Sequence, residues 1–87
     1  MTQTVYKYSL RIHDEQVVLL PKGAKILTVQ GQHGRICLWA LVNHVHGVEP
    51  RTILIRGTGH DFPEVGRYIS TFQMENGELV FHVFEAA

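Results

Sequence analysis

The sequence predicts an all-β domain, a small antiparallel sandwich or partly closed barrel of six to seven strands with little or no helix. Three observations support this prediction. Val, Ile and Thr, which favour strands, supply 22 of the 87 residues, whereas Ala occurs four times. Apolar and polar residues alternate in short segments, as in a half-buried strand. Clusters of Gly, Pro and Asn separate these segments. The length of 87 residues fits one domain, spanning residues 1–87.

Turn-forming residues divide the first part of the chain into three short strands. The first strand places Tyr6, Tyr8, Leu10 and Ile12 on one face, and residues 13–15 then form a turn. The second strand covers residues 16–20 and stops at a Pro-Lys-Gly turn. The third covers residues 24–30 and ends at the Gly-rich segment 31–34.

The next segment, Arg35–Val42, is apolar on both of its faces. Such a strand is typical of the middle of a sheet, covered on both sides by another layer or by a partner subunit. We therefore expect Trp39 to be largely buried in the core. This strand also predicts a symmetric homo-oligomer, most simply a two-fold dimer, because its apolar area exceeds what one thin core covers.

Three further strands are expected in the second half, over residues 52–56, 67–74 and 79–85. A polar, His-bearing loop, residues 43–50, precedes them, and an irregular segment, residues 61–66, contains a 3₁₀ turn around Pro63. The Asn76-Gly77 pair predicts a type I′ hairpin turn between the last two strands.

Composition excludes several classes of protein. Eight basic and eight acidic residues balance, which argues against a nonspecific nucleic-acid binder. The charges are uneven along the chain: residues 1–60 carry seven Lys/Arg and three Asp/Glu, a net of +4, and residues 61–87 carry one and five, a net of −4. No apolar run approaches the roughly 20 residues of a membrane-spanning helix. The single cysteine, Cys37, excludes an internal disulfide and lies in an apolar strand, where a thiol is inert.

The segment Arg56-Gly57-Thr58-Gly59-His60 is the main candidate for ligand binding. Two glycines around a hydroxyl allow successive backbone N–H groups to converge on an anion, and the Arg guanidinium suits phosphate. An aromatic side chain, Tyr68 or Phe62, is expected against a base, and Arg51 is a further candidate. The alternative is an ordinary Gly-rich bend at the end of a strand.

A metal site is the weaker alternative. On an extended segment, His44 and His46 would face the same way, and Glu49 and His60 could complete a cupin-like site. The spacing does not match that motif, so solvated loop histidines are the preferred interpretation. We expect no metal, no cofactor and no catalytic residue.

The chain resembles small uncharacterised proteins encoded by tailed bacteriophages. The resemblance covers most of the sequence and is carried by residues 5–8, 20–27, 38–42, 56–60, 68–73 and 80–85. It implies a phage accessory protein in the cytoplasm of an infected bacterium. Phage proteins of this size and class are often counter-defence factors.

Two functions remain open, and behind them a third, that of a structural accessory protein or a small metal-dependent enzyme. In the favoured one, a non-catalytic homo-oligomer sequesters a small anionic, nucleotide-like immune signal at residues 56–60. In the alternative, the protein inhibits a host defence complex by presenting an acidic face made of Glu75, Glu78 and Glu85. Neither function involves a membrane or a long nucleic acid.

Overall fold

The computed structural model describes residues 2–62 and 66–87, which form seven strands and two single-turn 3₁₀ helices. The strands are β1 (Thr4–Leu10), β2 (Glu15–Pro21), β3 (Lys25–Gln32), β4 (Arg35–Val42), β5 (Val48–Gly57), β6 (Gly66–Met74) and β7 (Leu79–Ala86). The helices are η1 (His44–His46) and η2 (Glu75–Gly77). The all-β prediction is confirmed. No helix in the described ranges is long and apolar enough to cross a membrane.

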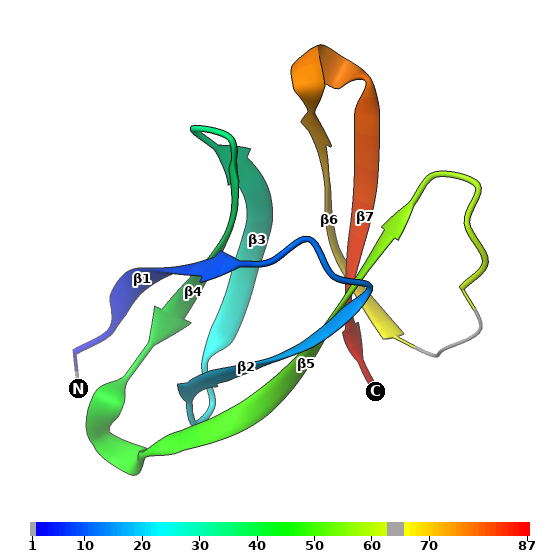
Figure 1. Ribbon diagram of the computed structural model, residues 1–87. Coiled ribbons are helices and arrows are strands. Elements are labelled where there is room, and N and C mark those ends of the chain that lie inside the picture. Colours follow the sequence, from blue (N-terminus) through cyan, green and yellow to red (C-terminus); the bar gives the residue numbers. More distant parts are fainter. Residues whose placement is uncertain (1, 63–65) are drawn as a thin grey trace.

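The strands form two antiparallel sheets, ordered β1-β4-β3 and β2-β5-β7-β6, which pack as a sandwich and not as a closed barrel (Figure 1). Strand β5 has ten residues and serves two neighbours. Its first part pairs with β2, from Val48 opposite Pro21, and its last part pairs with β7, up to Gly57 opposite Phe81. The molecule is elongated, with extents of 41 × 30 × 16 Å.

Alternating apolar positions from both sheets meet in one core. On β4, every second residue faces inward, and Leu38 and Ala40 have no exposed surface. The core consists of Leu20, Ala24, Ile26, Val29, Ile36, Leu38, Ala40, Val42, Ile53, Ile55, Phe72 and Val83. The burial of these side chains is the main stabilising contribution to the fold.

A buried serine joins the two sheets where β3 and β6 lie side by side. The Ser70 hydroxyl accepts a hydrogen bond from the Val29 N–H at 3.0 Å and donates one to the Val29 carbonyl at 2.7 Å. Each of these two strands also has an irregularity in its register, between Ile26 and Thr28 in β3 and between Tyr68 and Ser70 in β6. Ser70 therefore replaces, at this seam, the backbone partner that Val29 would have in a continuous sheet.

The prediction of a central strand at residues 35–42 is confirmed, because β4 lies between β1 and β3. The prediction for Trp39 is wrong about its place in the core: this side chain has intermediate exposure, so most of it is covered, but it lies outside the core. Trp39 pairs with Lys7 and Thr28, so it shares their outward face, while its neighbours Leu38 and Ala40 fill the core. In the described chain, no second layer covers that face.

The first strand ends earlier than expected, at Leu10, and Ile12 is 61% exposed. The side chain of Gln16 causes the early end. Its amide oxygen accepts from the Arg11 N–H at 3.0 Å, and its amide nitrogen donates to the Arg11 carbonyl at 2.7 Å. The backbone of Arg11 is thus bonded to a side chain and no longer to a neighbouring strand.

Two tight turns close the β3–β4 and β6–β7 hairpins. In the second, the Glu78 N–H donates to the Glu75 carbonyl at 3.1 Å, and Asn76 and Gly77 both have positive φ, 56° and 90°. These angles confirm the predicted type I′ turn. In the first hairpin, only His33 and Gly34 form the turn, with φ of 52° and 76°, so the strand continues through Gly31, where we had expected it to end.

The expected loop over residues 43–50 is shorter than predicted, because β5 already begins at Val48. Within it, residues 44–46 form helix η1, and the Asn43 side chain accepts a hydrogen bond from the Val45 N–H at 3.1 Å. The 3₁₀ turn expected around Pro63 lies outside the described residues.

Candidate functional site

The Gly-rich segment after β5 forms a tight turn. The His60 N–H donates to the Gly57 carbonyl at 3.1 Å, and Gly59 has φ of 86°, as the third position of a type II turn requires. The Thr58 N–H donates to the Val80 carbonyl at 3.3 Å. Because these two N–H groups are bonded to carbonyls, they do not converge on a common point. The predicted backbone nest is therefore absent, and the alternative of a Gly-rich bend describes this backbone.

The turn borders a small pocket where β5 ends and β7 begins. The pocket has a volume of about 330 Å³ and is lined by Gly57, Thr58, His60, Glu78, Leu79, Val80 and Phe81. The His60 ring lies directly over Gly57, since a Cβ built on this glycine would be 2.9 Å from Cε1 of the ring. Three of the seven residues predicted to bind a ligand, Gly57, Thr58 and His60, thus share one pocket.

A chain of side-chain hydrogen bonds crosses the outer face of β7 and β6. The Thr58 hydroxyl lies 2.7 Å from Nε2 of His82, and Nδ1 of His82 lies 3.0 Å from the Thr71 hydroxyl. The Thr71 hydroxyl in turn lies 2.8 Å from the Tyr68 hydroxyl. We call these four residues the hydroxyl–imidazole chain. A neutral imidazole donates at one nitrogen and accepts at the other, so the chain can reverse its donors and acceptors to suit a bound group.

The irregularity in β6 makes this chain possible. Tyr68 and Thr71 are three residues apart, so a regular strand would place them on opposite faces. The register shifts between Tyr68 and Ser70, and as a result Tyr68 pairs with Phe84 while Thr71 pairs with His82. Both side chains consequently lie on the same face as His82 and Phe84.

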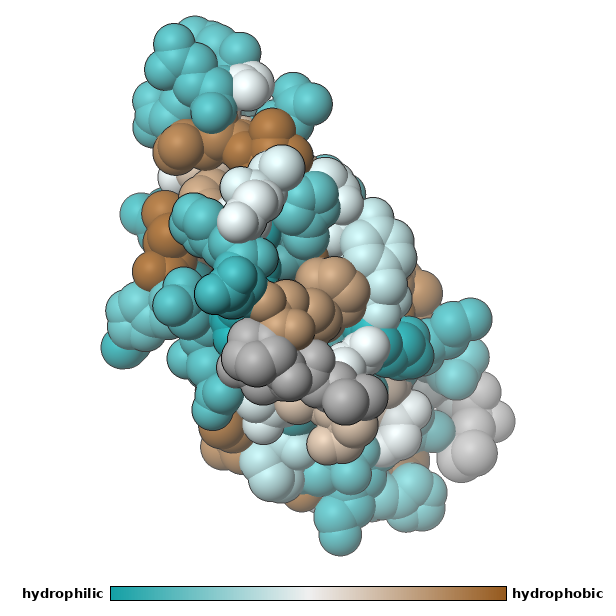
Figure 2. Space-filling model, turned by 90° about the vertical axis from the view of Figure 1, so that its right-hand side faces the viewer, coloured by the Kyte–Doolittle hydropathy of each residue, from teal (hydrophilic) through white to brown (hydrophobic). Residues whose placement is uncertain are grey.

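Aromatic rings lie beside the chain on the same face. The Phe62 and Phe84 rings stack with centroids 4.3 Å apart, and the Tyr68 ring meets Phe84 edge-on at 5.7 Å. Tyr68 itself is 55% exposed. Seen from the right-hand side of Figure 1, hydrophobic residues lie in separate patches among hydrophilic ones (Figure 2). The exposed Tyr68 ring could therefore stack on a planar ligand.

Arg56 supplies positive charge to this face. It pairs with His82 across β5 and β7, and its guanidinium carbon lies 5.7 Å from the centre of the Phe62 ring. One guanidinium nitrogen donates to the carbonyls of Asp14 and Ile55. The strand residues that pair with His82 and Phe84 are Arg56, Thr71, Leu54 and Tyr68, and none of these is a carboxylate. Arg56 therefore gives the strand surface around His82 a positive charge, whereas the adjoining pocket is lined by Glu78.

Arg51 does not belong to this site. Its guanidinium binds the Glu85 carboxylate through two nitrogens, one of them at 3.0 Å, and donates to the Ala24 carbonyl at 2.8 Å. Arg51 and Arg56 are five positions apart on β5, so their side chains lie on opposite faces of the sheet. Arg51 therefore holds strands together, and its guanidinium is not directed at the predicted ligand.

The ion pair between Arg51 and Glu85 removes one residue from the predicted acidic face. The Glu85 side chain is 14% exposed and is bound by Arg51 and, at 2.9 Å, by Arg67. These hydrogen bonds, above all that from Arg51, lower the pKa of the Glu85 carboxyl against the opposing effect of burial. Glu75 and Glu78 remain exposed at the β6–β7 turn. Since Glu85 cannot be presented to a partner, an acidic decoy surface would rest on two residues.

The residues of the metal alternative are dispersed. His44 and His46 lie on helix η1, so they do not share the face that an extended segment would give them, and the His44 ring instead contacts Tyr6 at 4.7 Å. Glu49 accepts a hydrogen bond from the Gly23 N–H at 2.8 Å. Across residues 2–62 and 66–87, no three His, Cys, Asp or Glu side chains group as metal ligands would.

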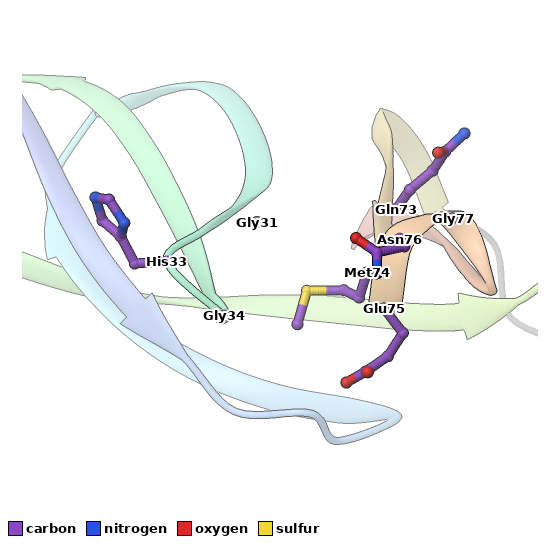
Figure 3. Close-up of a pocket in the computed structure, with 8 residues that line it drawn as sticks. All are labelled: Gly31, His33, Gly34, Gln73, Met74, Glu75, Asn76 and Gly77. Carbon is purple, nitrogen blue, oxygen red and sulfur yellow. The ribbon is translucent and has the colours of Figure 1, made fainter.

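A larger groove lies between the tips of the β3–β4 and β6–β7 hairpins. Its volume is about 570 Å³, and Figure 3 shows Met74 pointing into it toward Gly34, whereas the His33 ring turns away. Glu75 is the acidic residue of its lining, which contains no Lys or Arg. The pocket beside Gly57 is likewise lined by one acidic residue, Glu78, so this charge does not distinguish the two.

Comparison with known proteins identifies a family. The whole chain, residues 1–87, matches the family described as Domain of unknown function (DUF7352). The chain belongs to the DUF7352 family. No curated protein and no solved structure matches it.

Three residues of the candidate site were not predicted from the sequence: Thr71, His82 and Phe84. One signal was available. His82 and Phe84 alternate in the last strand, which places them on one face. Nothing in the sequence connected them with Thr58, because the contact depends on the pairing of β7 with β5.

Proposed function

We propose that this protein binds a small anionic, nucleotide-like ligand without turning it over, on the outer face of β5, β7 and β6. The observation that carries the proposal is the hydroxyl–imidazole chain. It presents an imidazole and three hydroxyl groups on a face to which Arg56 adds a positive charge. Phosphate oxygens are strong acceptors that suit such donors.

The aromatic side chains support the nucleotide part of the proposal. A base stacked on Tyr68 would lie beside the hydroxyl–imidazole chain, because the Tyr68 hydroxyl is itself a member of it. Stacking of a base on an aromatic ring is worth about 1–3 kcal/mol. The phosphate would then meet Thr58 and His82, and the pocket beside Gly57 would extend the site.

Binding without turnover is supported by the exposure of the chain. Thr58, Tyr68 and Thr71 are all exposed. Catalytic hydrogen bonds act most strongly where water is excluded, and an open strand surface does not exclude it. The proposed biological role, sequestration of a nucleotide immune signal during phage infection, rests on the resemblance to phage proteins.

Titration calorimetry on the full chain tests the proposal, with cyclic dinucleotides, cyclic and linear mononucleotides and inorganic phosphate as probes. Thr71→Val and Thr58→Val each remove one hydroxyl at nearly constant volume. Arg56→Lys keeps the positive charge but replaces the forked guanidinium by an ammonium group. Each lost hydrogen bond to a charged group should weaken binding by roughly tenfold to a hundredfold. Thr4→Val, at an exposed position on β1, is the matched control and should bind like the wild type.

Two results would reject the proposal. The first is that the wild type binds none of these probes. The second is that Thr58→Val, Thr71→Val and Thr4→Val all retain wild-type affinity, which would locate the binding site elsewhere. Circular dichroism of each variant separates lost binding from lost folding.

A further inference from the structure

Strand β2 is an edge strand that has the features preventing edge pairing only at its two ends, a charge at Glu15 and a proline at Pro21. Natural edges carry charges, bulges or a covering segment. Strand β1 has Lys7 at its centre, while β3 and β6 have irregular registers and are joined through Ser70. The pairing of β2 with β5 is regular over its whole length, and β2 contains no Lys or Arg. In the described chain, β5 is the one strand that pairs with β2.

The exposed face of β2 is apolar. Val17 and Leu19 are each 61% exposed, and Val48 on the neighbouring strand is 57% exposed. The register places Pro50 opposite Leu19, so these side chains adjoin one another. We call Val17, Leu19, Val48 and Pro50 the β2 strip. Contiguous exposed apolar side chains of this kind are typical of an interaction surface.

Open space runs along the edge. A groove of about 630 Å³ is lined by the five consecutive residues Glu15–Leu19 on one side and by Ser9, Arg11 and His13 on the other. Since consecutive residues of a strand point to alternate faces, a groove that touches all five follows the backbone edge. The unpaired backbone groups of β2 are therefore accessible to another strand.

We propose that β2 pairs antiparallel with β2 of a second copy of this chain, so that two four-stranded sheets become one continuous sheet about a two-fold axis. The midpoint of Glu15–Pro21 is Val18, so full overlap places Val18 on the axis. Val17 then lies opposite Leu19 of the second copy, and the two β2 strips merge. Such a self-complementary pairing is the usual geometry of a two-fold dimer.

The charges of β2 favour a second copy as the occupant. Glu15 is the one charged residue of the strand, and this register places it opposite Pro21 of the second copy, next to Lys22. Two opposite-charge contacts therefore form across the axis, and no like charges face each other. The proposal concerns a surface away from Thr58 and His82 and does not depend on ligand binding.

The mass of the ligand-free full chain in solution tests the proposal. Light scattering and sedimentation velocity should give twice 9.9 kDa for the wild type. Leu19→Lys and Val17→Lys each place a lysine in the centre of the joint, and each should give 9.9 kDa. Leu27→Lys is the matched control, because Leu27 is an exposed apolar residue of the other sheet, and this variant should keep the wild-type mass.

Charge reversal tests the register. Lys22→Glu places a carboxylate beside Glu15 of the second copy and should weaken the dimer, whereas the double variant Lys22→Glu with Glu15→Lys should restore it. A monomeric wild type would overturn the proposal. Binding of an unrelated peptide along β2 would not rescue it, because the proposed partner is a second copy of this chain. A dimer that persists in both Leu19→Lys and Val17→Lys would overturn it as well, because the copies would then associate through another surface.

Discussion

The imidazole of His60 occupies the space that a side chain on Gly57 would need. A Cβ built on Gly57 would lie 2.9 Å from Cε1 and 3.1 Å from Nδ1 of the ring, closer than unbonded atoms normally approach. The backbone of Gly57 has no positive φ, so its conformation alone does not require glycine. The requirement comes from the ring, which forms one wall of the pocket.

We therefore predict that Gly57→Ala destabilises the protein through His60. The contacting atoms belong to the ring of an exposed side chain, which can turn aside, so the methyl group should cost less than overpacking of a core does, about 0.5–1.5 kcal/mol for the displaced rotamer. The same substitution in a His60→Ala background should be nearly neutral, since the ring is then absent. Thermal unfolding of the four proteins in this double-mutant cycle measures the coupling. Equal losses in the two backgrounds would contradict the prediction.

A second prediction concerns the seam between the sheets. Ser70→Ala removes a hydroxyl that bonds both the N–H and the carbonyl of Val29 in a buried position. Leaving these groups without partners should lower the free energy of unfolding by about 1–3 kcal/mol. Ser9→Ala, at an exposed position on β1, is the control and should change stability little. Denaturant titration compares the two, and equal midpoints would show that water replaces the Ser70 hydroxyl.

The strands could be predicted from the sequence because alternation and turn residues are local signals. Strand β4 has the bounds that its apolar run predicted, and the Asn76-Gly77 turn has the angles that its residue types favour. What could not be predicted is the face to which a residue belongs when the register is irregular. Tyr68 and Thr71 share a face because β6 shifts its register between them, and no residue type in the segment marks that shift.

The site was predicted in part. The sequence identified residues 56–60, and the structure places Thr58 in contact with His82. It did not identify the partners of Thr58, because they come from strands that are distant in sequence. The expectation for Arg51 was based on residue type alone, and the partner that binds its guanidinium, Glu85, is 34 residues away in the sequence.

A third prediction tests the position of Trp39. The side chain of Leu38 has no exposed surface and lies in the core, whereas Trp39 is half-buried on the outward face. Leu38→Ala should cost about 2–5 kcal/mol, because it leaves a cavity. Trp39→Ala should cost less, although its side chain is larger, since solvent can fill the space it leaves. Chemical denaturation followed by circular dichroism measures both, and a larger loss for Trp39→Ala would place that ring in the core after all.

The final prediction concerns stability at acid pH and the partly buried Glu85. The pKa of its carboxyl is lowered in the folded protein, chiefly by the hydrogen bond from Arg51 and also by that from Arg67. In the unfolded chain the pKa of a glutamate is about 4.3. Because the folded value is lower, the stabilisation is fully present above about pH 4.3 and is lost as the pH falls through the folded value.

Glu85→Gln removes the charge that binds the partly buried Arg51 most closely, while the Glu49 carboxylate stays 3.8 Å from the guanidinium. Loss of this hydrogen bond between charged groups should cost about 1.5–3 kcal/mol at neutral pH. The melting temperature of the wild type should fall as the pH is lowered from 6 to 3, and that of Glu85→Gln should fall less, so the two curves converge at acid pH. Glu78→Gln removes an exposed carboxylate and should follow the wild-type curve. Parallel curves for the wild type and Glu85→Gln would mean that Arg51 does not lower the pKa of Glu85, and that the acid sensitivity of the fold comes from other carboxylates.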